Sequence, residues 1–167
     1  MRDRWRGRRT GLTLVVALTC GVIASSMVSA RGPGALVVRD DAGRVLARVS
    51  VGSDDAFSLR YRNSLYGTSA EERFLMVSDS RFRLAELAAE QLAVLEEYYA
   101  VSERPVRASS GSWRAPPAYD LELDRLTVAA TDLGQRTLLV LGEPPLALWQ
   151  LVDDAAPMVH ITVERAP

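Results

Sequence analysis

The polar residues best suited to bind a ligand gather in one short stretch of the chain, residues 61–74. The candidate ligand-binding residues are Tyr61, Arg62, Asn63, Ser64 and Glu72. Asn63 is the only asparagine in the chain, and its amide group can both donate and accept hydrogen bonds. Arg60 or Arg62 is available to pair with an anion. We therefore expect either a small polar binding site or a turn whose side chains cap their own backbone.

The usual sets of catalytic residues are missing from the sequence. It has one histidine, His160, and one cysteine, Cys20, which lies in the apolar N-terminal segment. A two-histidine metal site and thiol chemistry in the rest of the chain are therefore excluded. His160 alternates with Val159 and Ile161, which predicts that its ring points away from the core. We expect no enzyme, no catalytic residue and no cofactor.

Carboxylates occur in close pairs, and such pairs could supply oxygen ligands to a hard cation such as calcium. The pairs and clusters are Asp40-Asp41, Asp54-Asp55, Glu71-Glu72, Glu96-Glu97, Asp120 with Glu122 and Asp124, and Asp153-Asp154. Several of them border Gly, Ala or Pro, where Asp favours turn geometry. None has the spacing of a calcium-binding loop, so we expect solvated carboxylates and no metal site.

The candidate stretch resembles a known family in the order of its residues, which are Phe57, Tyr61, Asn63, Ser64, Leu65, Thr68 and Glu72. This order is similar to that of the domain-of-unknown-function 1850 family. In that family an aromatic strand precedes Tyr-x-His-Ser-Val, a Thr-Pro turn and a Glu that leads an apolar strand. Here Asn63 stands in place of the His and Ser69 in place of the Pro, and the family's Gly-Ala-Gly-Leu-Pro segment is missing. The resemblance covers about residues 36–99 and is clearest over residues 57–74.

The resemblance implies a short, exported, β-rich protein without an established activity. Genes of that family often neighbour those of TRAP-type solute transporters of the TAXI class, which implies an accessory role outside the membrane. On this basis the expected partner is a membrane transporter or a small organic anion.

In most of the remaining chain, short segments of alternating apolar and polar residues are separated by turn residues. Strands are expected at residues 35–39, 45–51, 57–62, 71–77, 121–127, 137–141, 146–152 and 159–164. Strands of this length and spacing favour a mainly β fold, a compact antiparallel sandwich or barrel of about seven or eight strands.

Two segments break the alternation. Apolar side chains recur at spacings of three and four over residues 84–99, which predicts one amphipathic helix there. The preceding Phe82-Arg83-Leu84 is also compatible with a strand. Residues 104–119 contain Pro, Ser and Gly, which predicts an exposed loop, and Trp113 in this loop is a candidate contact for another protein.

The first 30 residues have the features of an export signal. Five arginines and one aspartate give the first nine residues a net charge of +4, and residues 10–30 carry no charge and end in Val28-Ser29-Ala30. Residues 1–30 are therefore expected to be a cleaved signal peptide or, alternatively, an uncleaved N-terminal membrane anchor, because about 20 residues span a bilayer. In the second case, residues 10–30 would make the membrane contact. Residues 31–167 are expected to form a single β-rich domain, secreted or anchored outside the cytoplasm.

Composition narrows the class of protein further. A chain of 167 residues with 48% hydrophobic and 25% charged residues fits one globular domain and excludes a disordered polymer or a disulfide scaffold. All twenty basic residues are Arg, a bias typical of a high-GC bacterial genome. Beyond residue 30, fifteen arginines face twenty acidic residues, a net charge of −5 that disfavours binding to nucleic acid.

The sequence therefore predicts an accessory or binding protein at the outer face of the membrane, associated with a TRAP-type solute transporter. The alternative is a structural envelope domain that binds another protein and no small molecule.

Overall fold

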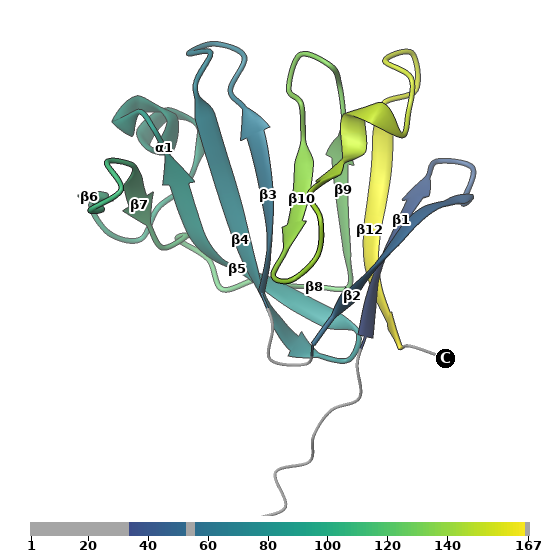
Figure 1. Cartoon of the computed structure of the whole chain (residues 1–167). Helices are drawn as coiled ribbons and strands as arrows, with labels where there is room; N and C mark the ends of the chain where they lie inside the picture. The colour runs from purple at the N-terminus through teal and green to yellow at the C-terminus, as the bar shows by residue number, and fades with distance from the viewer. Residues whose placement is uncertain (1–33, 53–55, 166–167) are drawn as a thin grey trace, which may run out of the picture.

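The structure is a computed structural model that describes residues 34–52 and 56–165. Within these ranges the chain folds into two antiparallel sheets, which Figure 1 shows side by side. The expected signal peptide or anchor, residues 1–30, lies outside the described residues. Among the described residues, no helix has the length and apolar character needed to cross a membrane.

The smaller sheet has four strands and joins the two ends of the described chain. Its order is β2 (Val45–Val51), β1 (Gly34–Asp40), β12 (Met158–Arg165) and β9 (Arg125–Ala129). The first strand pairs along its whole length with the last, from Gly34 opposite Arg165 to Asp40 opposite Val159. The ends of the described chain are therefore held together by a long-range strand pair.

The larger sheet carries the segments with the candidate residues. Its order is β11 (Leu146–Ala147), β10 (Thr137–Val140), β3 (Ala56–Arg62), β4 (Ser69–Ser78), β5 (Arg81–Ala89), β7 (Trp113–Ala115) and β6 (Val106–Arg107). The short β8 (Glu122–Leu123) also pairs with β5, and the 3-10 helix η1 (Leu148–Gln150) follows β11.

Alternating apolar side chains of both sheets form the main core. On the larger sheet, Phe57, Phe74 and Phe82 come from β3, β4 and β5 and are all almost fully buried. The rings of Phe57 and Phe74 stack with centroids 5.0 Å apart, and Phe82 meets both edge-on. The smaller sheet contributes residues such as Leu36 and Ile161. Two sheets packed in this way form a β-sandwich, and they do not close into a barrel.

The helix predicted over residues 84–99 is wrong in its extent. Residues 81–89 form strand β5, and the helix α1 covers only Leu92–Tyr98. The helix-like spacing of apolar residues in this strand comes from a β-bulge. Arg73 and Phe74 of β4 pair with Glu86 and Leu84, which leaves Ala85 as an extra residue. The bulge puts Leu84 and Leu87 on the same face of the sheet at the three-residue spacing that otherwise indicates a helix.

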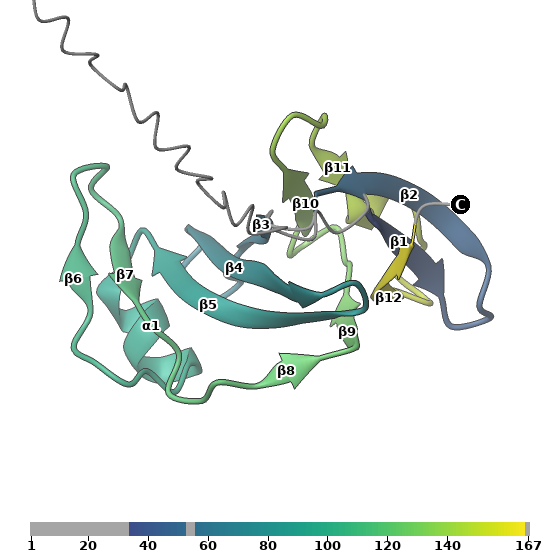
Figure 2. The same ribbon diagram turned by 90° about the horizontal axis from the view of Figure 1, so that it is seen from below.

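Helix α1 covers the end of the larger sheet with a second, smaller apolar cluster. Its buried Val94 and Leu95 pack against Leu87, Ala89 and Ala115 of the sheet. Figure 2 shows α1 on the same side of strands β4 and β5 as β8 and β9.

Several elements differ in detail from the sequence expectations. The predicted loop at residues 104–119 contains the β6–β7 hairpin, and the predicted strand at residues 146–152 is a two-residue strand followed by η1. Such short strands raise the number described to twelve. The described residues are nonetheless mainly β with a single helix, as predicted.

Candidate functional site

Asn63 holds the turn between β3 and β4. It is the one buried polar residue of the described chain, with 5% exposure. Its side-chain Oδ1 accepts hydrogen bonds from the backbone N–H groups of Leu65, at 3.1 Å, and Tyr66, at 3.0 Å. Its own backbone donates to Thr68 O and accepts from Gly67 N, both at 2.8 Å. Asn63 therefore closes a turn by capping backbone groups, the structural alternative considered from the sequence.

The two neighbours of Asn63 lie outside any common site with Glu72. Ser64 is exposed at the tip of the turn. Arg62 is exposed as well, and its Nε donates to the backbone oxygen of Gly67 at 3.3 Å. Arg62 lines a surface hollow together with Tyr61. Neither Ser64 nor Arg62 contacts Glu72.

Tyr61 and Glu72 do come together, through a residue that the sequence did not single out. The hydroxyl of Tyr99, which follows α1, donates to Glu72 Oε1 at 2.7 Å. The same hydroxyl lies 2.5 Å from that of Tyr61. The guanidinium carbon of Arg136 lies 4.6 Å from the centre of the Tyr61 ring, a cation–π contact. The result is a polar chain of Glu72, Tyr99, Tyr61 and Arg136.

This polar chain lies on the inner face of the sheet, between the two apolar clusters. In the strand register Glu72 is opposite Leu59 of the main core on one side and Leu87 of the second cluster on the other. Burial, followed by the charge of Glu72, raises the pKa of Tyr99 far above its usual range, and burial also raises the pKa of Tyr61. Both phenols therefore stay protonated at neutral pH, and Tyr99 remains a donor to the carboxylate. This arrangement fastens the end of α1 to β4.

The opposite, outer face of the larger sheet is hollowed into a trough. Figure 2 shows the β6–β7 hairpin and the β10–β11 hairpin rising on the same side of β3, β4 and β5. Between them lie three adjoining hollows of about 570, 510 and 560 Å³. We call this face the outer trough and define its floor by Arg60, Glu71, Arg73, Glu86, Ala88 and Arg114.

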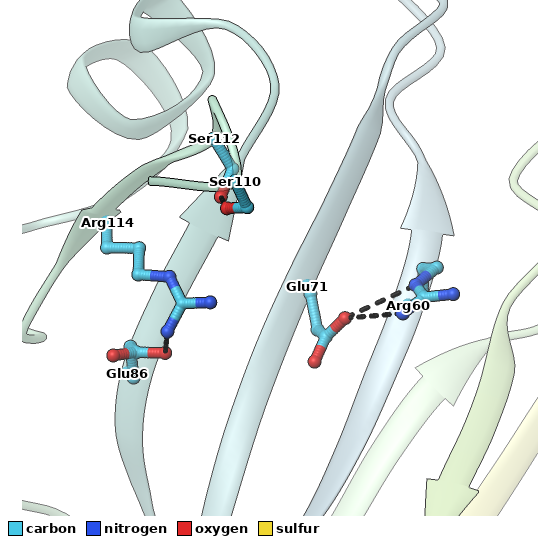
Figure 3. A network of polar contacts seen from close by, with 6 residues as sticks. All are labelled: Arg60, Glu71, Glu86, Ser110, Ser112 and Arg114. Atoms are coloured by element: carbon cyan, nitrogen blue, oxygen red, sulfur yellow. Dashed lines mark hydrogen bonds and ion pairs between the residues drawn. The ribbon is translucent and has the colours of Figure 1, made fainter. Parts of the chain in front are cut away.

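Two arginine–glutamate pairs lie across the floor of the outer trough, as Figure 3 shows. Both Nε and Nη2 of Arg60 donate to Glu71 Oε2, at 3.2 and 3.1 Å, which joins β3 to β4. Arg114 Nη1 donates to Glu86 Oε1 at 3.0 Å, which joins β7 to β5. The small side chain of Ala88 lies in register between Glu71 and Arg114, so the floor is low at that point.

Arg73 lies next to these pairs without a partner of its own. In the strand register it is opposite Ser58 on β3 and Glu86 on β5. Its side chain is exposed, and within the described ranges it makes no hydrogen bond or ion pair. The Nε of Arg114 is buried and also lacks a hydrogen-bond partner. The guanidinium group of Arg73 therefore offers the outer trough exposed N–H donors that the protein does not use itself.

One rim of the outer trough carries hydroxyl groups. Ser110 and Ser112, at the tip of the β6–β7 hairpin, are 2.9 Å apart between their Oγ atoms (Figure 3). Both line the same hollow as Arg73 and Arg114. Hydroxyls of this kind can donate to or accept from a ligand as needed.

Trp113 is less available than its place in a predicted loop suggested. It belongs to β7 and packs against the second apolar cluster. The guanidinium carbon of Arg107 lies 5.9 Å from the centre of its ring. The ring is therefore largely engaged by the protein's own residues.

His160 lies on the outer face of the smaller sheet, as its alternation predicted. Its Nδ1 is 2.8 Å from Thr127 Oγ1 on the paired strand β9, and its Nε2 is 2.8 Å from Asp41 Oδ1 in the β1–β2 turn. These bonds connect three segments of the smaller sheet. Over the described part of the chain, no group of three or more His, Cys, Asp or Glu side chains is placed to hold a metal ion.

Comparisons with known proteins add no assignment to this geometry. No protein-family model, no curated protein and no solved structure matches the chain.

Proposed function

We propose that the protein is an exported accessory or binding protein at the outer face of the membrane, and that its outer trough binds a small organic anion. The observation that carries this proposal is Arg73, an arginine without an ion pair beside two arginines that are already positioned by glutamates. A guanidinium group binds a carboxylate through two parallel hydrogen bonds, which gives both strength and orientation.

The neighbouring ion pairs prepare the site for such a ligand. Glu71 holds Arg60 from β3, and Glu86 holds Arg114 from β7, so both guanidinium groups are oriented before a ligand arrives. Less side-chain freedom is then lost on binding. Arg114 lines the same hollow as Arg73, which places a second guanidinium group beside a carboxylate bound there.

Features of the sequence support the proposed location and partner. The basic head and uncharged segment of residues 1–30 support export. The resemblance of residues 57–74 to the domain-of-unknown-function 1850 family supports an association with a TRAP-type solute transporter. In that role the protein would hold an organic anion outside the membrane for the transporter.

A solute-binding screen tests the proposal. The full chain is expressed, the exported protein is recovered, and its melting temperature is measured at low ionic strength with acetate, butyrate, succinate and benzoate. We expect at least one of these anions to raise the melting temperature of the wild type and to have no effect on Arg73→Ala. Arg125→Ala is the matched control, because Arg125 is also exposed and without an ion pair but lies on β9, outside the outer trough.

The alternative function makes the opposite prediction. A structural envelope domain that binds only another protein gains no stability from any anion in the panel. A screen without any shift contradicts anion binding in the outer trough and selects this alternative. Equal shifts in wild type and Arg73→Ala also contradict anion binding in the outer trough, because they place the bound anion elsewhere on the protein.

A further inference from the structure

The outer trough is not polar along its whole length. The hollow that contains Arg73, Glu86 and Arg114 continues toward β10, where leucine side chains line it. These leucines are Leu75 of β4, Leu139 of β10 and Leu141 just after β10. A charged floor thus passes directly into an apolar end.

We infer that the ligand of the outer trough is an amphiphilic monocarboxylate, with its carboxylate at Arg73 and its apolar tail over Leu75, Leu139 and Leu141. This inference rests on the proposed function and specifies its ligand class. Such a ligand has one negative charge and one hydrocarbon chain.

The strand register sets the distance between the two ends of such a ligand. Leu139 is opposite Ser58 of β3, and Ser58 is opposite Arg73 of β4. Two strand spacings therefore separate Leu139 from Arg73, about 10 Å. Leu75 follows Arg73 by two residues on the same face of β4, about 7 Å away. A tail of about six to eight carbons covers this span.

The exposure of Leu141 supports an apolar ligand at this end. Its side chain is 88% exposed, the highest value among the exposed large hydrophobic residues of the described chain. A single exposed leucine is common on protein surfaces. Here it adjoins Leu139 and Leu75 in one hollow, so a hydrocarbon tail laid along the trough removes apolar surface of all three from water.

The charges of the trough favour one negative charge over several. Arg60, Arg73 and Arg114 are accompanied in the same hollow by Glu71, Glu86 and Glu90. Positive and negative side chains are therefore balanced before a ligand binds. A monocarboxylate finds the one arginine without a partner, whereas a phosphate ester or a polyanion also meets repulsion from the glutamates.

A chain-length series measures the contribution of the tail. Acetate, butyrate, hexanoate and octanoate are titrated by calorimetry into the exported protein, below the concentrations at which they form micelles. We expect the affinity to rise about two- to fourfold for each added methylene, the range for partial to full burial of that group. Octylamine and octanol, which have the tail without the carboxylate, should bind at least tenfold more weakly than octanoate.

Leu139→Ser and Leu141→Ser provide the variants. Each should flatten the dependence on chain length while leaving butyrate affinity within about twofold of the wild type. Leu141 is so exposed that its replacement keeps the test valid even if Leu139→Ser unfolds.

The outcomes separate this inference from the function on which it rests. Equal affinities for butyrate and octanoate overturn the apolar tail but leave anion binding intact. Tight binding of octanol overturns the role of the carboxylate. If no carboxylate binds, the proposed function fails together with its ligand class.

Discussion

Replacing Tyr99 by phenylalanine removes one oxygen atom from the middle of the polar chain between Glu72 and Tyr61. The aromatic ring remains, so packing against the second apolar cluster is preserved. What is lost is the 2.7 Å hydrogen bond to Glu72 Oε1 and the contact with the Tyr61 hydroxyl. Glu72 then lies between Leu59 and Leu87 without this donor.

The size of the effect follows from this environment. A hydrogen bond to a charged group contributes about 1.5 to 3 kcal/mol to stability. Glu72 is half-buried, so a loss near the middle of that range, about 2 kcal/mol, is expected for Tyr99→Phe. In a domain of this size such a loss lowers the melting temperature by roughly 6 to 10 °C.

Tyr66→Phe is the matched control. The Tyr66 hydroxyl also donates to a carboxylate at 2.7 Å, but its partner Glu97 is exposed. Solvent replaces such a bond, so the cost should stay below about 1 kcal/mol. Urea denaturation followed by circular dichroism measures the free energy of unfolding of both variants. Equal losses in the free energy of unfolding for Tyr99→Phe and Tyr66→Phe would refute the inner-face position of Glu72.

The pH dependence of stability gives a second test of the same residue. The pKa of Tyr99 is raised in the folded protein, while an unfolded tyrosine ionises near pH 10. Above about pH 10 the unfolded state therefore binds fewer protons than the folded state, and stability falls as pH rises. We expect a shallower loss between pH 9 and 11 in Tyr99→Phe than in the wild type, measured by urea denaturation. The Tyr99→Phe variant should still lose some stability over this pH range, because the pKa of Tyr61 is also raised.

Three further predictions concern the turn, the smaller sheet and the N-terminus. Asn63→Ala removes the acceptor of two backbone N–H groups and should cost about 1 to 3 kcal/mol in urea denaturation, without changing anion affinity in calorimetry. A large loss of anion binding in a folded Asn63→Ala protein would instead indicate that Asn63 belongs to a binding site. Hydrogen bonds from Arg39 and then Arg48 lower the pKa of Glu164. Its contribution to stability is therefore present above the unfolded value near pH 4.3 and is lost as the pH falls below it, so Glu164→Gln should flatten the acid limb of a stability profile. An unchanged acid limb would contradict that assignment. We expect N-terminal sequencing of the expressed protein to find Arg31 as the first residue, and a full-length chain in the membrane fraction would instead select the anchor.

The strands were predictable where their apolar alternation is local. In β3, Phe57 and Leu59 are buried and Arg60 is exposed, as a period of two requires. The same rule placed His160 on the outer face of β12. Each of these predictions needs only the few residues on either side, because a strand with one buried face fixes its own orientation.

The helix boundary failed because a long-range pairing decides it. The bulge at Ala85 exists only when β5 pairs with β4, and nothing in residues 81–89 reveals this partner. Their good helix formers, such as Leu84, Glu86 and Leu87, supported the opposite prediction. Pairing with β4 along the hairpin outweighed that local preference.

The candidate site was predictable in part. Tyr61 and Glu72 do share a face and a hydrogen-bonded chain, but Tyr99, which connects them, lies 27 residues beyond Glu72. The outer trough depends on the pairing of β5 with β7, which brings Arg114 beside Glu86. Glu71 and Arg73 lie two residues apart on one face of β4, and the sequence analysis did not single out this pair. Only the register between strands shows that Glu86 and Arg114 lie beside them.

The most direct test of the account is calorimetric titration of butyrate into wild type, Arg73→Ala and Arg125→Ala at low ionic strength. A charge-assisted hydrogen bond of about 1.5 to 3 kcal/mol corresponds to roughly a ten- to hundredfold change in affinity. We therefore expect Arg73→Ala to bind butyrate at least tenfold more weakly than the wild type, and Arg125→Ala to bind it as the wild type does. Equal affinity of Arg73→Ala and the wild type, or an equal loss in both variants, would contradict anion binding in the outer trough.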